Sequence, residues 1–139
     1  MPNTTQSKGV ASVSLVLQQT GADCAVAGVA MLLGRSYAEV FQANEELSRS
    51  VRKVGASDAA IRKLVRALGA SLTKTLKVDL DDDTGLLALK SSDIEKQAHH
   101  LVVLFRGVLV DPGTCLLWDP EVYLQTHSHL SVWYLLELT

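Results

Sequence analysis

The pattern of hydrophobic and polar positions changes its period near the middle of the chain. Between residues 24 and 68 apolar residues recur at helical spacing, and in 58–68 they stand at i, i+3, i+4 and i+7. From residue 72 onward, short segments alternate between apolar and polar residues or are apolar throughout, which is typical of strands. Helices followed by strands predict an α+β domain in which N-terminal helices pack on an antiparallel β-sheet.

Capping residues divide the first half of the chain into helices. Gly34 and Gly69 are typical of the position that follows a helix C-terminus. Ser36 and Glu39 have the spacing of a capping box, and Ser57 is a typical N-cap residue. We therefore expect helices over residues 24–33, 37–48 and 58–68.

The expected strands lie before the first helix and in the second half of the chain. They are residues 11–17, 72–78, 85–90, 101–105, 108–110 and 130–138. Strands 101–105 and 108–110 carry apolar residues on both faces, so we expect this hairpin to be central and buried. Arg106-Gly107 would form the two-residue turn between them.

Composition and charge exclude several classes of function. The 139 residues are 47% hydrophobic and carry a net charge of −2, which gives no attraction to nucleic acid or to an anionic membrane surface. The longest apolar run, residues 25–33, is far shorter than the roughly 20 residues of a membrane span. Residues 1–9 show no pattern of a secretory signal, so we expect none, and two cysteines make no disulfide framework. We expect a flexible N-terminus over 1–10 and a single cytoplasmic domain over 11–139, with no nucleic-acid partner and no membrane span.

The first candidate for chemistry is Cys24, which opens the most apolar run in the chain. A polar turn from Gln18 to Asp23 delivers this thiol to the first turn of the expected helix 24–33. A helix N-terminus carries unpaired N–H groups and a partial positive charge, which favour the thiolate form of a cysteine. The other thiol, Cys115, follows a Gly-Thr pair in a turn, and we expect it to be packed or idle.

A base and an orienting acid follow from the parity of the expected hairpin. With a two-residue turn, Val102 faces Asp111, and His100 lies on the same side of the sheet as both. His100 is then the diagonal neighbour of Asp111. A three-residue turn would instead place His99 on that face. Two-residue turns are the commoner choice, so the prediction is His100, with His99 as the alternative.

These residues are the parts of a cysteine nucleophile activated by an oriented imidazole. Cys24 would attack, His100 would take its proton and Asp111 would orient the ring. The Gln18 amide, just before the nucleophile, could hold an oxyanion beside the Cys24 N–H. The competing interpretation is structural: a cysteine packed in a core helix, a histidine at a strand edge and an ordinary Asp-Pro turn.

The same residues resemble the C39 cysteine peptidases, papain-like domains of bacteriocin-exporting transporters that cut leader peptides after a double glycine. The resemblance covers residues 15–115 and is weakest over 70–98. It implies a papain-like fold with Gln18 as oxyanion donor, Cys24 as nucleophile, His100 as general base and Asp111 as orienting acid. The matching positions are Gln18, Asp23-Cys24, Ala27, Met31, His100 to Leu104, Asp111-Pro112, and Gly55-Ala56-Ser57 with the helix 58–68.

The chain departs from the family pattern in two respects. Ala25 stands where the family commonly has glycine, and we expect no transmembrane region and no ATPase domain in these 139 residues. A free-standing peptidase, or a relative with another substrate, is therefore expected, and the substrate is a peptide or a protein. The same parts would serve an isopeptidase, a deamidase or an acyltransferase, and a non-catalytic peptide-binding module is the further alternative. No cofactor is expected, and no metal, because CxxC and HExxH motifs are lacking.

Overall fold

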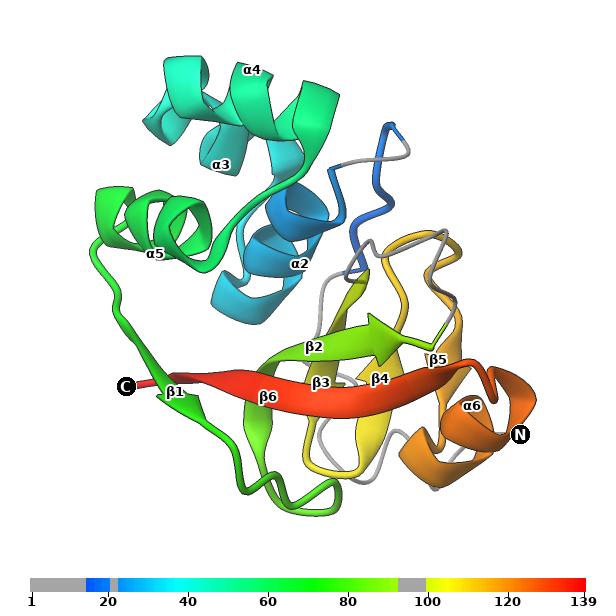
Figure 1. The fold of residues 1–139 in the computed structure, drawn as a ribbon. Coiled ribbons are helices and arrows are strands. Elements are labelled where there is room, and N and C mark those ends of the chain that lie inside the picture. The colour runs from blue at the N-terminus through cyan, green and yellow to red at the C-terminus, as the bar shows by residue number, and fades with distance from the viewer. Residues whose placement is uncertain (1–14, 21–22, 93–99) are drawn as a thin grey trace.

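The fold consists of a helical layer packed on one face of an antiparallel sheet (Figure 1). The computed structural model describes residues 15–20, 23–92 and 100–139. In these ranges the helices are α2 (Cys24–Leu33), α3 (Tyr37–Ala43), α4 (Glu45–Val54), α5 (Asp58–Ala67) and α6 (Pro120–Thr126). The strands are β1 (Leu72–Thr75), β2 (Thr84–Ser91), β3 (His100–Phe105), β4 (Val108–Val110), β5 (Leu117–Trp118) and β6 (Leu130–Leu138). The predicted α+β class is confirmed.

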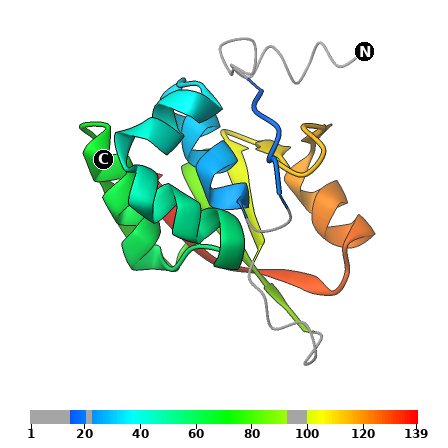
Figure 2. The same ribbon diagram turned by 90° about the horizontal axis from the view of Figure 1, so that it is seen from above.

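The strand order in the sheet is β1-β6-β2-β3-β4-β5, and every neighbouring pair is antiparallel. One face of the central strands packs on α2, and Leu86 and Val103 on that face are fully buried. The opposite face forms a second buried cluster, in which Leu87 and Val102 pack with Tyr123 of α6. Seen from above, α6 lies apart from the other helices (Figure 2). The expectation that the β3–β4 hairpin is central and buried on both faces is confirmed.

The helix that carries the thiol is the centre of the helical layer. Every residue of α2 from Ala25 to Leu32 is buried, because the sheet and the surrounding helices enclose it. A Cβ added at Gly28 would lie 3.2 Å from a Leu86 methyl group, so this glycine permits close packing of α2 on the sheet. The helix ends as predicted at Gly34, whose φ of 66° lies in the left-handed region.

The expected helix 37–48 is in fact two helices. Asn44 leaves the helical conformation, and its side chain accepts the N–H of Leu47 and thereby caps α4. The predicted capping box of Ser36 and Glu39 is present at the start of α3, and Ser57 caps α5 as predicted. The internal N-cap was missed because Asn44 lies within a continuous helical pattern.

Other boundaries also differ from the prediction. The strand expected over 72–78 ends at Thr75. A loop that contains Asp79, Asp81, Asp82 and Asp83 then leads to β2. Residues 15–17 are not a strand, and residues 1–14, including the expected flexible N-terminus, lie outside the described residues. Neither α6 nor β5 was predicted. Asp119 followed by Pro120 is a typical N-cap and first-turn pair, and Asp119 accepts the N–H groups of Glu121 and Val122, so this helix start could have been recognised.

Among the described helices, none is both long enough and apolar enough to span a membrane by itself. By length and composition alone, α2 and α3 would qualify as a pair, but a bend of 108° separates their axes.

Candidate active site

The thiol of Cys24 stands at the first residue of α2, at the end of a tight polar turn. The carboxylate of Asp23 organises this turn by accepting the N–H groups of Gln19 and Thr20, at 3.1 and 2.9 Å, and the hydroxyl of Tyr37. Asp23 is fully buried, and its side chain makes no cap hydrogen bond to α2. The N–H groups of the first helical turn are therefore not capped by this side chain, which leaves the positive end of the helix directed at the thiol.

His100 is the first residue of β3 and is bonded to Asp111, the residue that follows β4. The distance from His100 Nε2 to Asp111 Oδ1 is 3.1 Å. The hairpin turn has two residues, because Phe105 pairs with Val108 and Val103 with Val110. This register brings His100 and Asp111 to the same face, as the predicted parity requires. The alternative base, His99, lies outside the described residues.

Asp111 is held by groups other than the imidazole. Its Oδ1 also accepts the Gly113 N–H at 2.9 Å, and its Oδ2 accepts the Tyr123 hydroxyl at 2.7 Å. The Tyr123 ring is buried, stacks on His127 at 4.1 Å between centroids and meets Trp118 edge-on. Tyr123 was not predicted as a residue of the site, because it lies on α6, a helix that was not predicted either.

The imidazole and the carboxylate stabilise each other's charged forms. Burial would lower the pKa of His100, but hydrogen bonds to Asp111 and Cys24 and the charges of both groups outweigh burial and raise it to about 9. Burial would raise the pKa of Asp111, but the hydrogen bonds from His100, Tyr123 and Gly113 hold it at about 2. At neutral pH the pair is therefore an imidazolium and a carboxylate.

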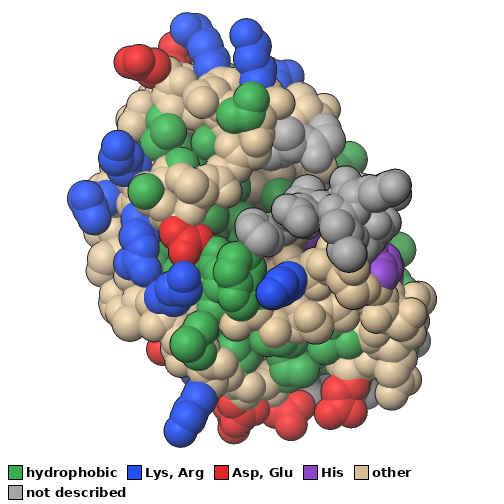
Figure 3. Space-filling view, in the orientation of Figure 1, with side chains coloured by type: hydrophobic (Ala, Val, Ile, Leu, Met, Phe, Trp, Pro, Cys, Tyr) green, Lys and Arg blue, Asp and Glu red, His purple; other side chains and the backbone are tan. Residues whose placement is uncertain are grey.

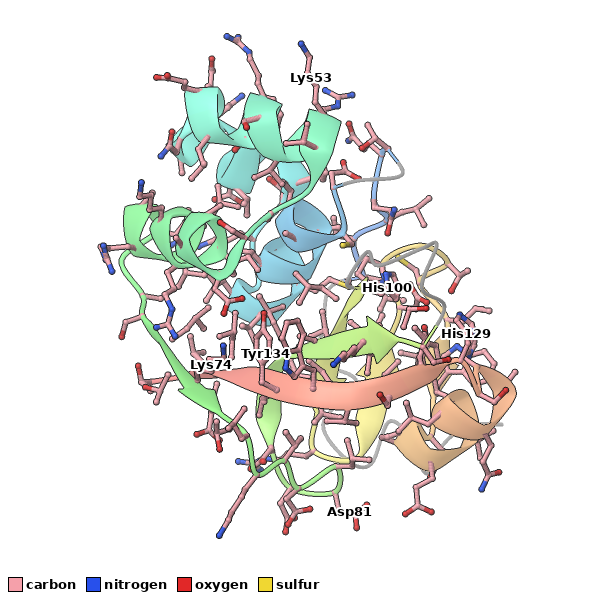
Figure 4. All side chains as sticks on the ribbon, viewed as in Figure 1. Lys53, Lys74, Asp81, His100, His129 and Tyr134 are labelled. Carbon is pink, nitrogen blue, oxygen red and sulfur yellow. The ribbon has the colours of Figure 1, made fainter. Side chains whose placement is uncertain are left out.

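The histidine lies between the thiol and the acid. The ring nitrogen Nε2 is engaged by Asp111, and the Cys24 side chain lines the same groove and is close enough to raise the pKa of His100. Figure 4 shows His100 near the start of α2, at the top of the sheet. The structure thus brings together Cys24, His100 and Asp111, which are 76 and 11 residues apart in sequence. An imidazolium beside a thiol can stabilise the thiolate, which is the nucleophilic form of cysteine.

Gln18 lies on the Asp111 side of this site. Its backbone N–H donates to the Pro112 carbonyl at 2.9 Å, and its side-chain oxygen lies next to Gly113. The amide Nε2 donates to the Thr20 carbonyl at 2.7 Å, so one of its two hydrogens is used within the turn. Gln18 Oε1 is buried without a hydrogen-bond partner in the described part of the chain. The amide is thus fixed beside the site, with one N–H left to donate.

The second thiol is not part of this arrangement. Cys115 lies in the turn after Asp111 with a φ of 57°, and its N–H donates to the Asp111 carbonyl at 2.7 Å. Burial and the charge of Asp111 raise the pKa of the Cys115 thiol. Of the two thiols, Cys24 is thus the one that has an imidazolium beside it.

A groove of about 1160 Å³ opens from the thiol along the junction between the helical layer and the sheet. Cys24 and His100 line one part of it. The loop between α4 and α5 and the residues Trp133 and Tyr134 of β6 line the rest. In residues 15–20, 23–92 and 100–139, no group of three or more His, Cys, Asp and Glu side chains is placed to hold a metal ion. A group bound along this groove would lie next to the Cys24 thiol and the His100 imidazolium.

The chain matches no family model, and no curated protein matches it.

Proposed function

We propose that this chain is a cytoplasmic cysteine peptidase of the papain-like, C39-like type, which cleaves a peptide or isopeptide bond in a peptide or protein. The observation that carries the proposal is the position of His100, which is hydrogen-bonded to Asp111 and lines the same groove as Cys24, close enough for the Cys24 side chain to raise its pKa. A histidine packed for structural reasons alone needs no nucleophile at a helix start on its second side. The groove that exposes both Cys24 and His100 supports the proposal, because a substrate can reach them.

The proposed reaction has two stages. The Cys24 thiolate attacks the scissile carbonyl, and the His100 imidazolium gives its proton to the departing amine, which leaves a thioester on Cys24. Water then gives a proton to the neutral His100 and attacks the thioester, which releases the carboxylic acid and restores the Cys24 thiolate and the His100 imidazolium. The Cys24 N–H and the remaining N–H of the Gln18 amide are the proposed donors to the oxyanion. Asp111 keeps the imidazole oriented throughout.

Alkylation of Cys24 by iodoacetamide as a function of pH tests the activated thiolate. We expect fast single alkylation of the wild-type chain well below pH 8.5, the range in which an ordinary cysteine ionises. Intact mass should show no such fast label on Cys24→Ala and a rate about tenfold or more lower on His100→Ala. Cys115 provides an internal comparison, because its raised pKa predicts slow labelling.

Hydrolysis itself is tested on a peptide library prepared from a digested proteome. New peptide ends produced by the wild-type chain and absent with Cys24→Ala would establish peptidase activity. Fast alkylation without new ends would indicate another acyl-transfer reaction, such as deamidation. Slow alkylation with an ordinary thiol profile would contradict the proposal and indicate a non-catalytic binding module.

A further inference from the structure

The groove contains an aromatic pair whose position depends on an irregularity in the sheet. Along β6, Val132 pairs with Leu89 of β2 and Tyr134 pairs with Ala88, so Trp133 is the extra residue of a β-bulge. In a regular strand, consecutive side chains point to opposite faces. Here Trp133 and Tyr134 both line the groove. Because a bulge redirects a side chain without ending a strand, this one provides two adjacent aromatic groups on one surface.

The two aromatic residues differ in exposure. Tyr134 is 5% exposed and donates its hydroxyl to Asp58. Trp133 is 38% exposed, and it packs at an angle on the Tyr134 ring, with 5.0 Å between centroids. An exposed tryptophan beside an active-site groove offers a large apolar contact area to a bound side chain.

Lysines surround this aromatic pair. Lys63 and Lys74 line the groove, and the amine of Lys90 lies 5.8 Å from the centre of the Trp133 ring. Figure 4 shows Lys74 and Tyr134 side by side, and the Lys74 amine lies 4.1 Å from the Tyr134 ring centre. Figure 3 shows an apolar patch on this face with Lys or Arg side chains on both sides.

Among the described residues, one acidic side chain lines the same region, and its charge is already engaged. Asp58 accepts from the Tyr134 hydroxyl and pairs with Lys74 at 3.1 Å. The charges of Asp58 and Lys74 therefore offset each other, and Lys63 and Lys90 leave a positive potential at this end of the groove.

We infer that this end of the groove, formed by Trp133, Tyr134 and the three lysines Lys63, Lys74 and Lys90, recognises a segment of the substrate in which a large apolar residue stands next to an acidic one. The apolar side chain packs on Trp133, and the carboxylate faces the lysines. The inference rests on the proposed function only in so far as the bound segment belongs to a substrate that reaches Cys24. Binding itself requires no catalysis.

Two pools of short fluorescein-labelled peptides test the inference without turnover. Both pools carry a central Leu or Phe, flanked by Asp or Glu in one pool and by Lys or Arg in the other. Fluorescence anisotropy is measured with the Cys24→Ala protein, in which bound peptide is not cleaved. We expect the acidic pool to bind about tenfold more tightly at low salt, and the preference to shrink as ionic strength rises.

Substitutions identify the part of the surface that binds the acidic pool. In the Cys24→Ala background, Lys63→Glu and Lys90→Glu should each weaken its binding about fivefold, and Trp133→Ala should weaken both pools. Lys53→Glu is the matched control and should leave binding unchanged, because Lys53 is exposed, does not itself line the groove and lies far from Lys74 and Tyr134 (Figure 4).

Each outcome separates this inference from the proposed peptidase. Equal binding of the two pools, no binding of either, or indifference to Trp133→Ala and to both lysine substitutions would overturn the inference. Selective binding of the acidic pool by a chain whose Cys24 is not activated would uphold the inference while the peptidase proposal fails. An activated Cys24 in a chain that binds both pools equally would support the peptidase proposal and overturn the inference.

Discussion

At the scale of single residues, the candidate site depends on a chain of contacts that extends from the thiol into the core. Cys24 contacts His100, His100 contacts Asp111, and Asp111 accepts the hydroxyl of Tyr123. The Tyr123 hydroxyl donates to Asp111, and this contact connects Tyr123 to His100 and Cys24. It is a positioning residue, which acts through Asp111 on the orientation of His100.

Replacing Tyr123 by Phe should slow alkylation of Cys24 at pH 6.5 by about tenfold, which corresponds to one hydrogen bond to a charged group. Phe keeps the ring packing on Trp118 and His127, so the fold should be retained. The alkylation rate is measured by intact mass. In the Asp111→Asn background, the same substitution should have almost no further effect, because its route to His100 is already broken. A full tenfold loss in that background would show that Tyr123 affects the thiol independently of Asp111, and would contradict the positioning role.

Replacing Asp111 by Asn should lower the pKa of His100 from about 9 by about 1–3 units, because the carboxylate is one of the groups that raise it. The titration of the His100 ring protons by NMR measures this directly. Asp119→Asn is the control, since it removes the same charge from the start of α6 and keeps a good N-cap residue. An unchanged His100 midpoint in Asp111→Asn would mean that Asp111 does not control the imidazole.

At the scale of elements, the hairpin was the part of the site that the sequence could specify. A two-residue turn fixes the register of β3 and β4, and the register decides which histidine shares a face with Asp111. The helix start at Cys24 was likewise readable from the polar turn before the apolar run. Local rules suffice for both, because each depends on residues close together in sequence.

The contacts that hold the site in place could not be predicted from local sequence. The sequence predicted no structural role for Asp23, because Tyr37, which donates its hydroxyl to Asp23, lies on another helix. Tyr123 reaches Asp111 only because α6 packs on the far face of the sheet. The bulge at Trp133 depends on how β6 aligns with β2, which are about 40 residues apart. Such contacts arise from the tertiary fold, and no local sequence pattern predicts them.

The close approach of β2 to β6 gives a prediction for an element. A Cβ added at Gly85 would lie 2.3 Å from the backbone oxygen of Leu136, so Gly85→Ala must push the two strands apart. We expect it to lower the free energy of unfolding by about 2–3 kcal/mol. Gly34→Ala meets no atom within 4 Å and carries only the strain of a positive φ, so it should lower that free energy by about 1 kcal/mol. Urea unfolding of both variants measures the two losses of free energy. A larger loss in Gly34→Ala than in Gly85→Ala would contradict the expectation.

At the scale of the whole molecule, the candidate site lies at the meeting point of the two layers. Cys24 belongs to the helical layer, whereas His100 and Asp111 belong to the sheet and its β4 loop. Cys24 and His100 come together only when the layers are packed against each other. Formation of the site is therefore coupled to the packing of the layers, and the ionisation of the site should in turn affect the stability of the fold.

The pH dependence of unfolding tests this coupling. The pKa of His100 rises from 6.5 to about 9 on folding, so its contribution to stability is fully present below pH 6.5 and is lost as the pH rises through 9. The free energy of unfolding of the wild-type chain should fall over this range by up to about 3 kcal/mol, measured by urea unfolding at pH 6 and 9.5. In His100→Ala the fall over the same range should largely disappear. An equal fall in both chains would mean that the charge of His100 is not what joins the two layers.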